Sequence, residues 1–295
     1  MKILLTGKNG QVGWELQRAL ASLGDVAAFD KSELDLMKAD TINARVRDVR
    51  PDIIVNAGAY TSVDGAERDP QLAMAVNGIA PGILAEAALR LKAFLIHYST
   101  DYVFDGAKAG PYREDDVPNP INIYGATKLA GETVIRQVGP AHLILRTSWV
   151  YGTRGRNFLV KILQLMQEQD ELRVVSDQIG APTWCRAIAE ATARILAMRR
   201  AGTAPSEPNG LFHLTALDST SWYQFAREIV ARVPPPRGTL PNVTAISSDD
   251  YLSPAKRPKN SVLANDKFRE TFGFTLNSWQ SDLESALAEY RERAS

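Results

Sequence analysis

The sequence begins with the stretch MKILLTGKNGQVGWELQRALASLG (residues 1–24), which decides the fold. Its apolar run KILLTG (2–7) has the length and composition of a buried strand, and a glycine-rich turn follows directly. The next segment has a helical repeat that ends at Gly24, with its apolar residues on one stripe at Val12, Leu16 and Leu20. A strand that leads through a glycine turn into a helix predicts the first unit of a parallel α/β fold.

Further apolar runs alternate with helical segments: VAAFD (26–30), DIIVNAGA (52–59), FLIHYST (94–100) and HLILRTSW (142–149). They lack the apolar/polar alternation of half-exposed strands, so we expect strands buried on both faces. Residues 1–150 therefore predict a doubly wound, Rossmann-type parallel sheet, a dinucleotide-binding domain. Residues 151–295 predict a smaller, mainly substrate-binding α+β domain, with a return to the first domain around residues 180–217 that includes the strand-like LFHLTAL (211–217).

Composition excludes several classes of function. The formal net charge is zero and the basic residues are dispersed, so we expect no nucleic-acid partner. The single cysteine, Cys185, cannot form an intramolecular disulfide, which favours a reducing compartment. The first apolar run is interrupted before a signal-peptide core forms, and no apolar run approaches the ~20 residues that span a bilayer. We therefore expect a soluble, cytoplasmic protein with no membrane segment.

The glycine turn lies between the first strand and the first helix. Gly7, Gly10 and Gly13 allow a tight turn and let a diphosphate approach the amides at the helix N-terminus. Asp30 closes the second strand, where an acid can bond the adenine-side ribose, whereas its neighbour Lys31 can instead meet a 2′-phosphate. The choice between NADH and NADPH is therefore open. In the LDL stretch at 34–36, Asp35 and Leu36 can contact the adenine. Alternatively, the stretch forms a turn with one buried leucine.

The stretch INIYGATKLAGE (121–132) places Tyr124 four residues before Lys128 on one face of a predicted helix. Reduction of a carbonyl needs a proton donor, and a tyrosine serves if a nearby cation lowers its pKa from about 10. Lysine can also bond the nicotinamide ribose. The spacing alone is a weak signal, but the stretch STDYVFDG (99–106) brings Thr100 and Asp101 to the end of a buried strand, where such sheets bind ligands.

The motifs together resemble the dTDP-4-dehydrorhamnose reductase family of extended short-chain dehydrogenases/reductases. The resemblance covers nearly the whole chain and is carried by the glycine turn and by NAGAYTSVDGAE, STDYVF, YGATK, RTSWVYG, SDQIGAPT and KRPKNSVL. It implies reduction of dTDP-4-dehydro-L-rhamnose to dTDP-L-rhamnose with NADH or NADPH.

The resemblance also assigns roles to individual residues. Tyr124 corresponds to the proton donor, Lys128 to its partner and Thr100 to the third catalytic group. Gly10, Gln11 and Val12 correspond to the diphosphate-binding turn. Gly58, Ala59 and Tyr60 correspond to the strip beneath the cofactor, and Thr61 to a position near the nicotinamide. The substrate contacts are Val63, Asp101 and Trp149. A thymidine diphosphate also needs cations, and either Arg257 or Lys256 supplies one, or both are ordinary solvated surface residues.

The family implies a magnesium ion held by glutamates at a dimer interface, and here the sequence departs from it. Glu15 matches one ligand, but Arg186 stands where a second carboxylate is expected. The late candidates Glu289 and Glu292 are read as a solvated helix face. We therefore predict no metal and leave the oligomeric state open, with a homodimer among the alternatives. The three histidines are expected in the core or near the cofactor: His97, His142 and His213.

Related chains suggest other functions. Some are cofactor-binding regulatory subunits without redox chemistry, but the intact Thr100, Tyr124 and Lys128 argue against this. Sister dehydratases carry an Asp-Glu pair after the threonine, whereas Asp101 is followed here by Tyr102. Sister epimerases usually have small residues around the catalytic serine or threonine, unlike TDYVF. A net reductase fits best.

Overall fold

The computed structural model describes residues 1–203, 209–235 and 238–294. Its centre is a six-stranded sheet in the order β10-β5-β4-β3-β1-β2, with every neighbouring pair parallel. The strands are β1 (Lys2–Thr6), β2 (Asp25–Phe29), β3 (Ile53–Asn56), β4 (Phe94–Thr100), β5 (His142–Thr147) and β10 (Gly210–His213). The chain progresses from β1 to β2 on one side and from β3 outward on the other, so the predicted doubly wound sheet is confirmed.

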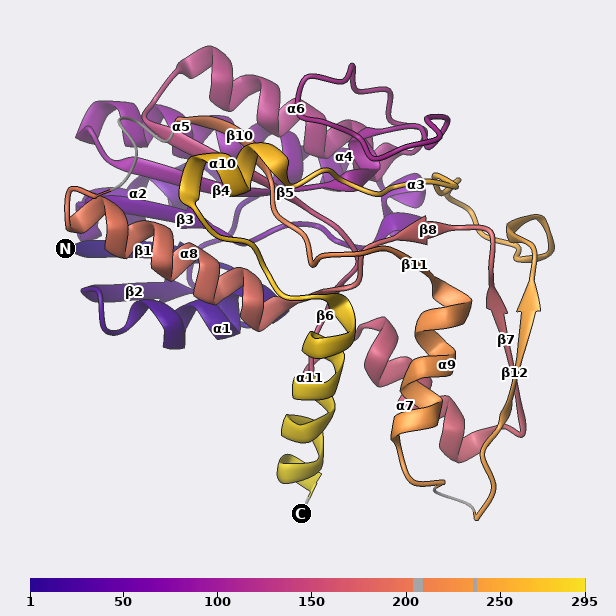
Figure 1. Cartoon of the computed structure of the whole chain (residues 1–295). Helices are drawn as coiled ribbons and strands as arrows, with labels where there is room; N and C mark the ends of the chain where they lie inside the picture. The colour runs from indigo at the N-terminus through magenta and orange to yellow at the C-terminus, as the bar shows by residue number, and fades with distance from the viewer. Residues whose placement is uncertain (204–208, 236–237, 295) are drawn as a thin grey trace.

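Helices cover both faces of this sheet (Figure 1). One face packs against α1 (Gln11–Leu20) and α8 (Cys185–Arg200), and the other against α2 (Ala39–Val49), α5 (Ala80–Leu91) and α6 (Ile123–Val138). Successive strand residues point to opposite faces: Ile3 and Leu5 belong to the first core, and Leu4 to the second. All three are fully buried. Burial on both sides explains why the strands show no polar alternation.

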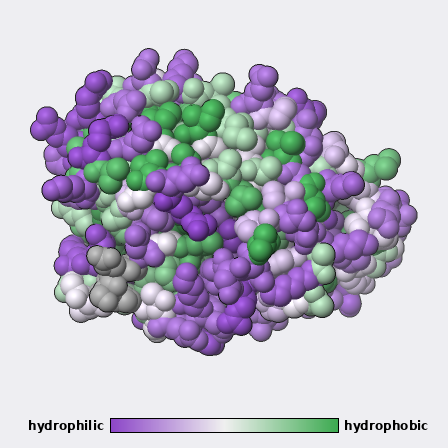
Figure 2. Space-filling view, turned by 90° about the horizontal axis from the view of Figure 1, so that it is seen from above, coloured by the Kyte–Doolittle hydropathy of each residue, from purple (hydrophilic) through white to green (hydrophobic). Residues whose placement is uncertain are grey.

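A long continuous helical region ends with α5. It begins with α4 (Pro70–Met74), continues through a π-helical turn η1 (Ala75–Ile79) into α5, and follows the short α3 (Val63–Arg68). By length and composition, Pro70–Leu91 could cross a membrane, so the expectation that no apolar run approaches this length was wrong. However, 56% of its apolar window is buried inside the chain, as in the core helix of a soluble protein. Seen from above, the surface is mainly hydrophilic, with hydrophobic residues in separate groups (Figure 2).

The later part of the chain adds short strands and helices beside the sheet. In Figure 1, β7 and β12 lie next to α7 and α9, to one side of the six-stranded sheet. The strand β10 alone joins that sheet from beyond residue 151 within the described residues, while α8 packs on α1. The remaining elements are β6 (Val150–Tyr151), α7 (Phe158–Glu168), β7 (Glu171–Val175), β8 (Ile179–Gly180), β9 (Thr183–Trp184), β11 (Thr220–Ser221), α9 (Trp222–Arg232), β12 (Asn242–Ile246), α10 (Asp266–Phe272) and α11 (Trp279–Ala294), with 3₁₀ turns η2 (Asp101–Val103) and η3 (Ser248–Asp250).

Candidate active site

The glycine turn joins β1 to α1 by very close backbone packing. Gly7 has a φ of +73°, a conformation that side chains disfavour, and a Cβ on Gly13 would lie 2.0 Å from the Gly7 carbonyl oxygen. Gly10 precedes α1 and has no side chain to cap it, so the first amides of the helix keep no side-chain partner at this position. Gln11 and Val12 form the first turn. This arrangement can accept a diphosphate.

The adenine side of the turn is lined with charge. The Asp30 carboxylate accepts hydrogen bonds from Ser32 (Oγ, 2.6 Å) and Asn9 (Nδ2, 3.0 Å), and it lies 3.9 Å from the Lys8 ammonium. The hydrogen bonds from Ser32 hold the pKa of Asp30 below its usual value. Lys8 also pairs with Glu33. Two acids and a lysine therefore lie together at the end of β2, and this mixture of charges leaves NADH and NADPH as alternatives.

The strip at residues 58–61 follows β3, and side chains of neighbouring elements hydrogen-bond its backbone. Thr6 Oγ1 accepts the Gly58 amide (3.0 Å), and Leu36 packs so closely on Gly58 that a Cβ there would meet Leu36 Cδ1 at 2.8 Å. Asn77, in the π-helical turn, bonds both the amide and the carbonyl of Tyr60 (2.9 and 3.0 Å). The structure therefore brings Leu36 to the strip, next to Asp35. Asn77 was not predicted, because its role depends on a π turn that sequence periodicity does not reveal.

The catalytic candidates meet at the carboxyl end of β4. Lys128 is buried, and its ammonium donates to the Tyr98 carbonyl oxygen (2.6 Å) and lies 3.5 Å from His97 Nε2. Burial lowers the pKa of Lys128 to about 8. Burial also lowers the pKa of His97, whose Nδ1 bonds the Asn56 amide (3.0 Å). His97 thus connects the lysine to β3, whereas His142 and His213 are buried at other sites.

Tyr124 differs from the sequence expectation in one respect. Burial raises the pKa of its phenol to about 12, a hydrogen bond with Thr100 acts to lower it, and the Asp101 charge raises it. The expected lowering by Lys128 is not among the causes of this shift. The phenol is therefore protonated at neutral pH, the form that a proton donor needs. Burial likewise raises the pKa of Asp101 to about 7.

The N-terminus of α6 fixes where Tyr124 lies. Asn122 caps the helix by accepting the Gly125 amide (2.8 Å), and Glu67 of α3 accepts the Ile123 amide (2.8 Å). Tyr102 packs edge-on against Tyr124, with ring centroids 6.0 Å apart. The helix that carries the catalytic pair is thus held by α3 and by the turn after β4.

Trp149 has a φ of +46°, a strained conformation for a tryptophan. Its ring stacks on Trp222 with centroids 3.5 Å apart, and it lies so close to Gly180 that a Cβ there would meet it at 2.4 Å. Trp222, which was not predicted, also lines a cavity of about 410 Å³ between α7 and β7. Other residues that line this cavity are Phe158, Val175, Gln178, Tyr251 and Arg257.

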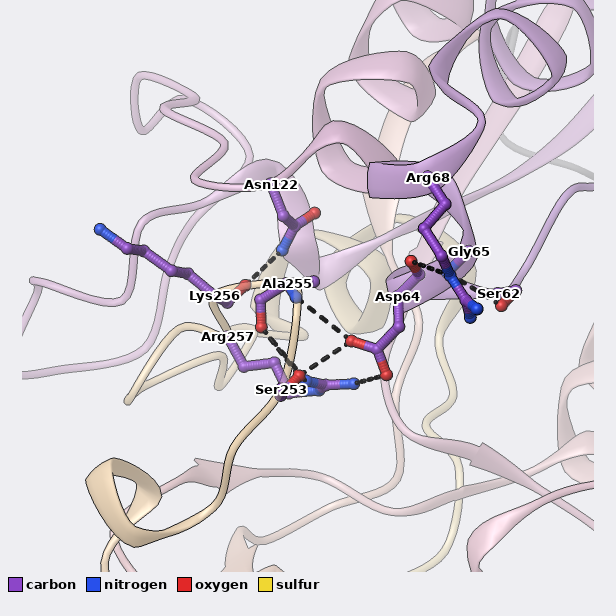
Figure 3. A network of polar contacts seen from close by, with 9 residues as sticks. All are labelled: Ser62, Asp64, Gly65, Arg68, Asn122, Ser253, Ala255, Lys256 and Arg257. Carbon is purple, nitrogen blue, oxygen red and sulfur yellow. Dashed lines mark hydrogen bonds and ion pairs between the residues drawn. The ribbon is translucent and has the colours of Figure 1, made fainter.

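Arg257 is not a free surface cation. Its Nη2 donates to the Asp64 carboxylate of α3 (3.0 Å), one residue after Val63 (Figure 3). Lys256, by contrast, is exposed, and its carbonyl accepts from Asn122 (2.8 Å). Thr61 is exposed at the edge of the strip. The structure therefore joins Arg257 to α3 through Asp64.

The acidic residues considered as metal ligands are engaged by Arg186. Its Nε donates to Glu15 (3.1 Å), and its Nη2 lies 2.9 Å from Glu289. The interpretation of Glu289 as a solvated residue was wrong, because its side chain is only 15% exposed and also accepts from Thr153. The guanidinium lies between the two carboxylates and neutralises their charge, so it takes the place that a magnesium ion would need. These residues do not fit the metal that the family implies, and its absence remains a prediction.

An anion-accepting turn and a protonated tyrosine beside a lysine occupy the same edge of a doubly wound sheet. This combination defines an oxidoreductase of the extended short-chain dehydrogenase/reductase class, which uses a nicotinamide dinucleotide.

Comparison with known proteins identifies the family. The model of the family described as "RmlD substrate binding domain" matches residues 1–292. The chain is 47% identical to dTDP-4-dehydrorhamnose reductase of Burkholderia thailandensis, over 95% of this chain and 96% of the relative. It is 44% identical to the Escherichia coli K12 protein of the same name, over 98% of each chain. The chain belongs to the dTDP-4-dehydrorhamnose reductase family.

Solved structures agree with this assignment. The crystal structure of dTDP-4-dehydrorhamnose reductase from Bacillus anthracis in complex with NADP matches with a TM-score of 0.90 and 34% identity, and covers 98% of this chain and 99% of that one. The UDP-glucose 4-epimerase of Thermotoga maritima matches with a TM-score of 0.82 at 18% identity, over the full length of both chains. The epimerase shares the fold.

Proposed function

We propose that this protein reduces the C4 ketone of dTDP-4-dehydro-L-rhamnose to form dTDP-L-rhamnose, with NADH or NADPH as the reductant. This makes it an oxidoreductase of nucleotide-sugar biosynthesis. The observation that supports the proposal is that Thr100 ends β4 while Tyr124 and Lys128 lie one helical turn apart on α6, with the Lys128 ammonium bonded to the Tyr98 carbonyl of β4. The family relatives and the NADP complex of a solved relative support the substrate and the cofactor.

The reduced nicotinamide supplies the hydride when it is bound. Tyr124 then donates its phenolic proton to the sugar oxygen, because burial keeps the phenol protonated near neutral pH. The Thr100 hydroxyl, which bonds the phenol, orients that oxygen. With the cofactor bound, Lys128 would hold the nicotinamide ribose, and its ammonium, one helical turn from the tyrosine on the same face of α6, would supply the positive charge that stabilises the phenolate.

The cofactor is held by the residues of the turn and the strip. The turn of Gly7, Gly10 and Gly13, with Gln11 and Val12, takes the diphosphate, and Asp30 takes the ribose. Asp35 and Leu36 border the adenine. The strip beneath the nicotinamide half comprises Gly58, Ala59, Tyr60 and Thr61.

The substrate lies between the catalytic residues and the later part of the chain. Val63, Asp101 and Trp149 contact the sugar, and Arg257 binds its diphosphate. The cavity of about 410 Å³ that Arg257 and Trp222 line has the size and the mainly apolar lining of a small-molecule site. It is placed to receive the nucleoside.

We also propose that the enzyme is soluble and cytoplasmic and binds neither nucleic acid nor membrane. Its zero net charge and the burial of Pro70–Leu91 support this. The single thiol, Cys185, is buried, and burial raises its pKa to about 12, so it is unreactive at neutral pH. A homodimer remains an alternative to the monomer.

The test is the loss of absorbance of reduced cofactor when purified protein meets dTDP-4-dehydro-L-rhamnose. We expect one cofactor oxidised for each sugar reduced, whereas an epimerase would consume none. Tyr124→Phe removes only the transferable proton, so turnover should fall by about 10²- to 10⁴-fold while NADPH affinity stays within about twofold. Near-normal turnover in this variant would sink the assignment of Tyr124.

A further inference from the structure

The segment at residues 253–257 is fastened to the dinucleotide-binding half by one carboxylate (Figure 3). Asp64 accepts hydrogen bonds from three of its groups: the Ser253 hydroxyl (2.8 Å), the Ala255 amide (3.3 Å) and Arg257 Nη2 (3.0 Å). Arg257 closes the ring by donating through Nη1 to Ser253 and to the Ala255 carbonyl. We call Asp64 with residues 253–257 the clasp. It joins positions about 190 residues apart in the chain.

The clasp determines where the Arg257 guanidinium lies. Without Asp64, a long side chain on an irregular segment would explore many rotamers, and ordering it would cost conformational entropy. Here the carboxylate and the hydroxyl orient two of its nitrogens, and only 21% of the side chain is exposed. The guanidinium borders the cavity of about 410 Å³, and its charge acts to lower the pKa of the Tyr102 phenol. Its position at the cavity wall is therefore preorganised.

The clasp is also tied to the catalytic helix. Asn122 donates to the Lys256 carbonyl (2.8 Å) with the same side chain that caps α6. Tyr102, which contacts Arg257, packs edge-on against Tyr124. Asp64 itself lies on α3, whose Glu67 caps the same helix. The guanidinium and the proton donor are thus parts of one hydrogen-bonded frame.

We infer that Asp64 is a positioning residue for nucleotide-sugar binding: it orients Arg257 so that the guanidinium meets the substrate diphosphate, without itself touching substrate. This inference rests on the proposed function, which places a diphosphate at Arg257. Asp64 acts through Arg257, so its removal weakens binding of the nucleotide sugar and leaves cofactor binding and the chemical step intact.

The experiment compares Asp64→Asn with a matched control. The variant removes the charge and keeps an oxygen for Ser253 and Ala255. Asp48→Asn removes the same charge from an exposed site on α2, where Asp48 is 66% exposed and pairs with Arg45 at 3.7 Å. Titration calorimetry measures binding of dTDP and of NADPH, and initial rates give kcat and KM for the sugar. Thermal unfolding confirms that both variants fold.

Asp64→Asn should weaken dTDP binding and raise the KM for the sugar by about tenfold, the value of one charge-assisted contact. Its kcat and its NADPH affinity should stay within about twofold, and Asp48→Asn should match the wild type. In an Arg257→Met background, Asp64→Asn should add less than about twofold, because two residues that act through one contact are not additive.

Three results would overturn the inference: dTDP binding equal to that of Asp48→Asn, tighter dTDP binding, or a full effect that persists in Arg257→Met. Tighter binding would mean that Asp64 competes with the diphosphate for the guanidinium. Failure of the proposed function gives a different result, because the wild-type protein would then not oxidise NADPH in the presence of the sugar. The dTDP titration still tests the clasp in that case.

Discussion

The glycine turn at residues 7–13 and the clasp formed by Asp64 with residues 253–257 are assigned to the two ligands, cofactor and substrate, yet they are built by opposite means. The turn is made within a few residues by backbone contact, with Gly13 pressed against the Gly7 carbonyl. The clasp is made by side-chain charge between distant parts of the chain, with Arg257 held by Asp64. The first depends on the absence of side chains, and the second on their presence.

This difference predicts different sensitivities. Steric contacts in the turn do not respond to salt or pH, because no charge is involved. The ion pair of the clasp is partly exposed, with Asp64 35% exposed, so it is weakened by salt and can rearrange when a ligand arrives. The turn assigned to the cofactor is thus held by close steric packing, whereas the arginine assigned to the substrate is held by an ion pair.

The largest effect is expected from Gly13→Ala. Its Cβ would lie 2.0 Å from the Gly7 carbonyl oxygen, so α1 must shift away from the turn. Overpacking of this kind should lower the free energy of unfolding by about 1–3 kcal/mol and abolish tight NADPH binding. Denaturant unfolding and calorimetry measure the two effects. Gly110→Ala is the control, because nothing lies within 4 Å of its Cβ, and it should change stability by less than about 0.5 kcal/mol. Unaltered NADPH affinity in Gly13→Ala would contradict the assignment of the turn.

A smaller effect is expected from pH, through Lys128. Burial lowers the pKa of its ammonium from 10.5 to about 8, and the proposed mechanism uses the charged form. The charge is therefore present below pH 8 and is lost as the pH rises through that value. We expect kcat/KM to fall about tenfold for each pH unit above 8, measured with initial rates in buffers of constant ionic strength. A profile that stays flat from pH 7 to 10 would show that the lysine charge is not required.

The smallest effect is expected at Arg186, which, like Arg257 in the clasp, forms ion pairs with distant segments of the chain. Because its guanidinium already pairs with Glu15 and Glu289, EDTA should leave both the unfolding temperature and the turnover unchanged. Arg186→Met, by comparison, should lower the free energy of unfolding by about 1 kcal/mol, since it leaves two carboxylates side by side. Loss of activity in EDTA that magnesium restores would refute the prediction that no metal binds.

Much of the first half was predictable because its signals are local. A strand followed by a glycine turn and a helical stripe can be read within 24 residues, and the pair Tyr124 and Lys128 is visible from helical spacing. The protonation of Tyr124 was not predictable, because the burial of its phenol depends on packing. Glu289 was misread for the same reason, since its partner Arg186 lies on another helix.

The sequence by itself determined the doubly wound sheet, the glycine turn between β1 and α1 and the helical spacing of Tyr124 and Lys128, since periodicity and glycine spacing act over neighbouring residues. Only the tertiary structure decided that Asn77 supports the strip at Tyr60, that Trp222 stacks on Trp149 and that Asp64 holds Arg257. These contacts join residues 17, 73 and 193 positions apart. Nothing in a local pattern specifies such partners, because they are set by how separate segments of the chain pack against each other.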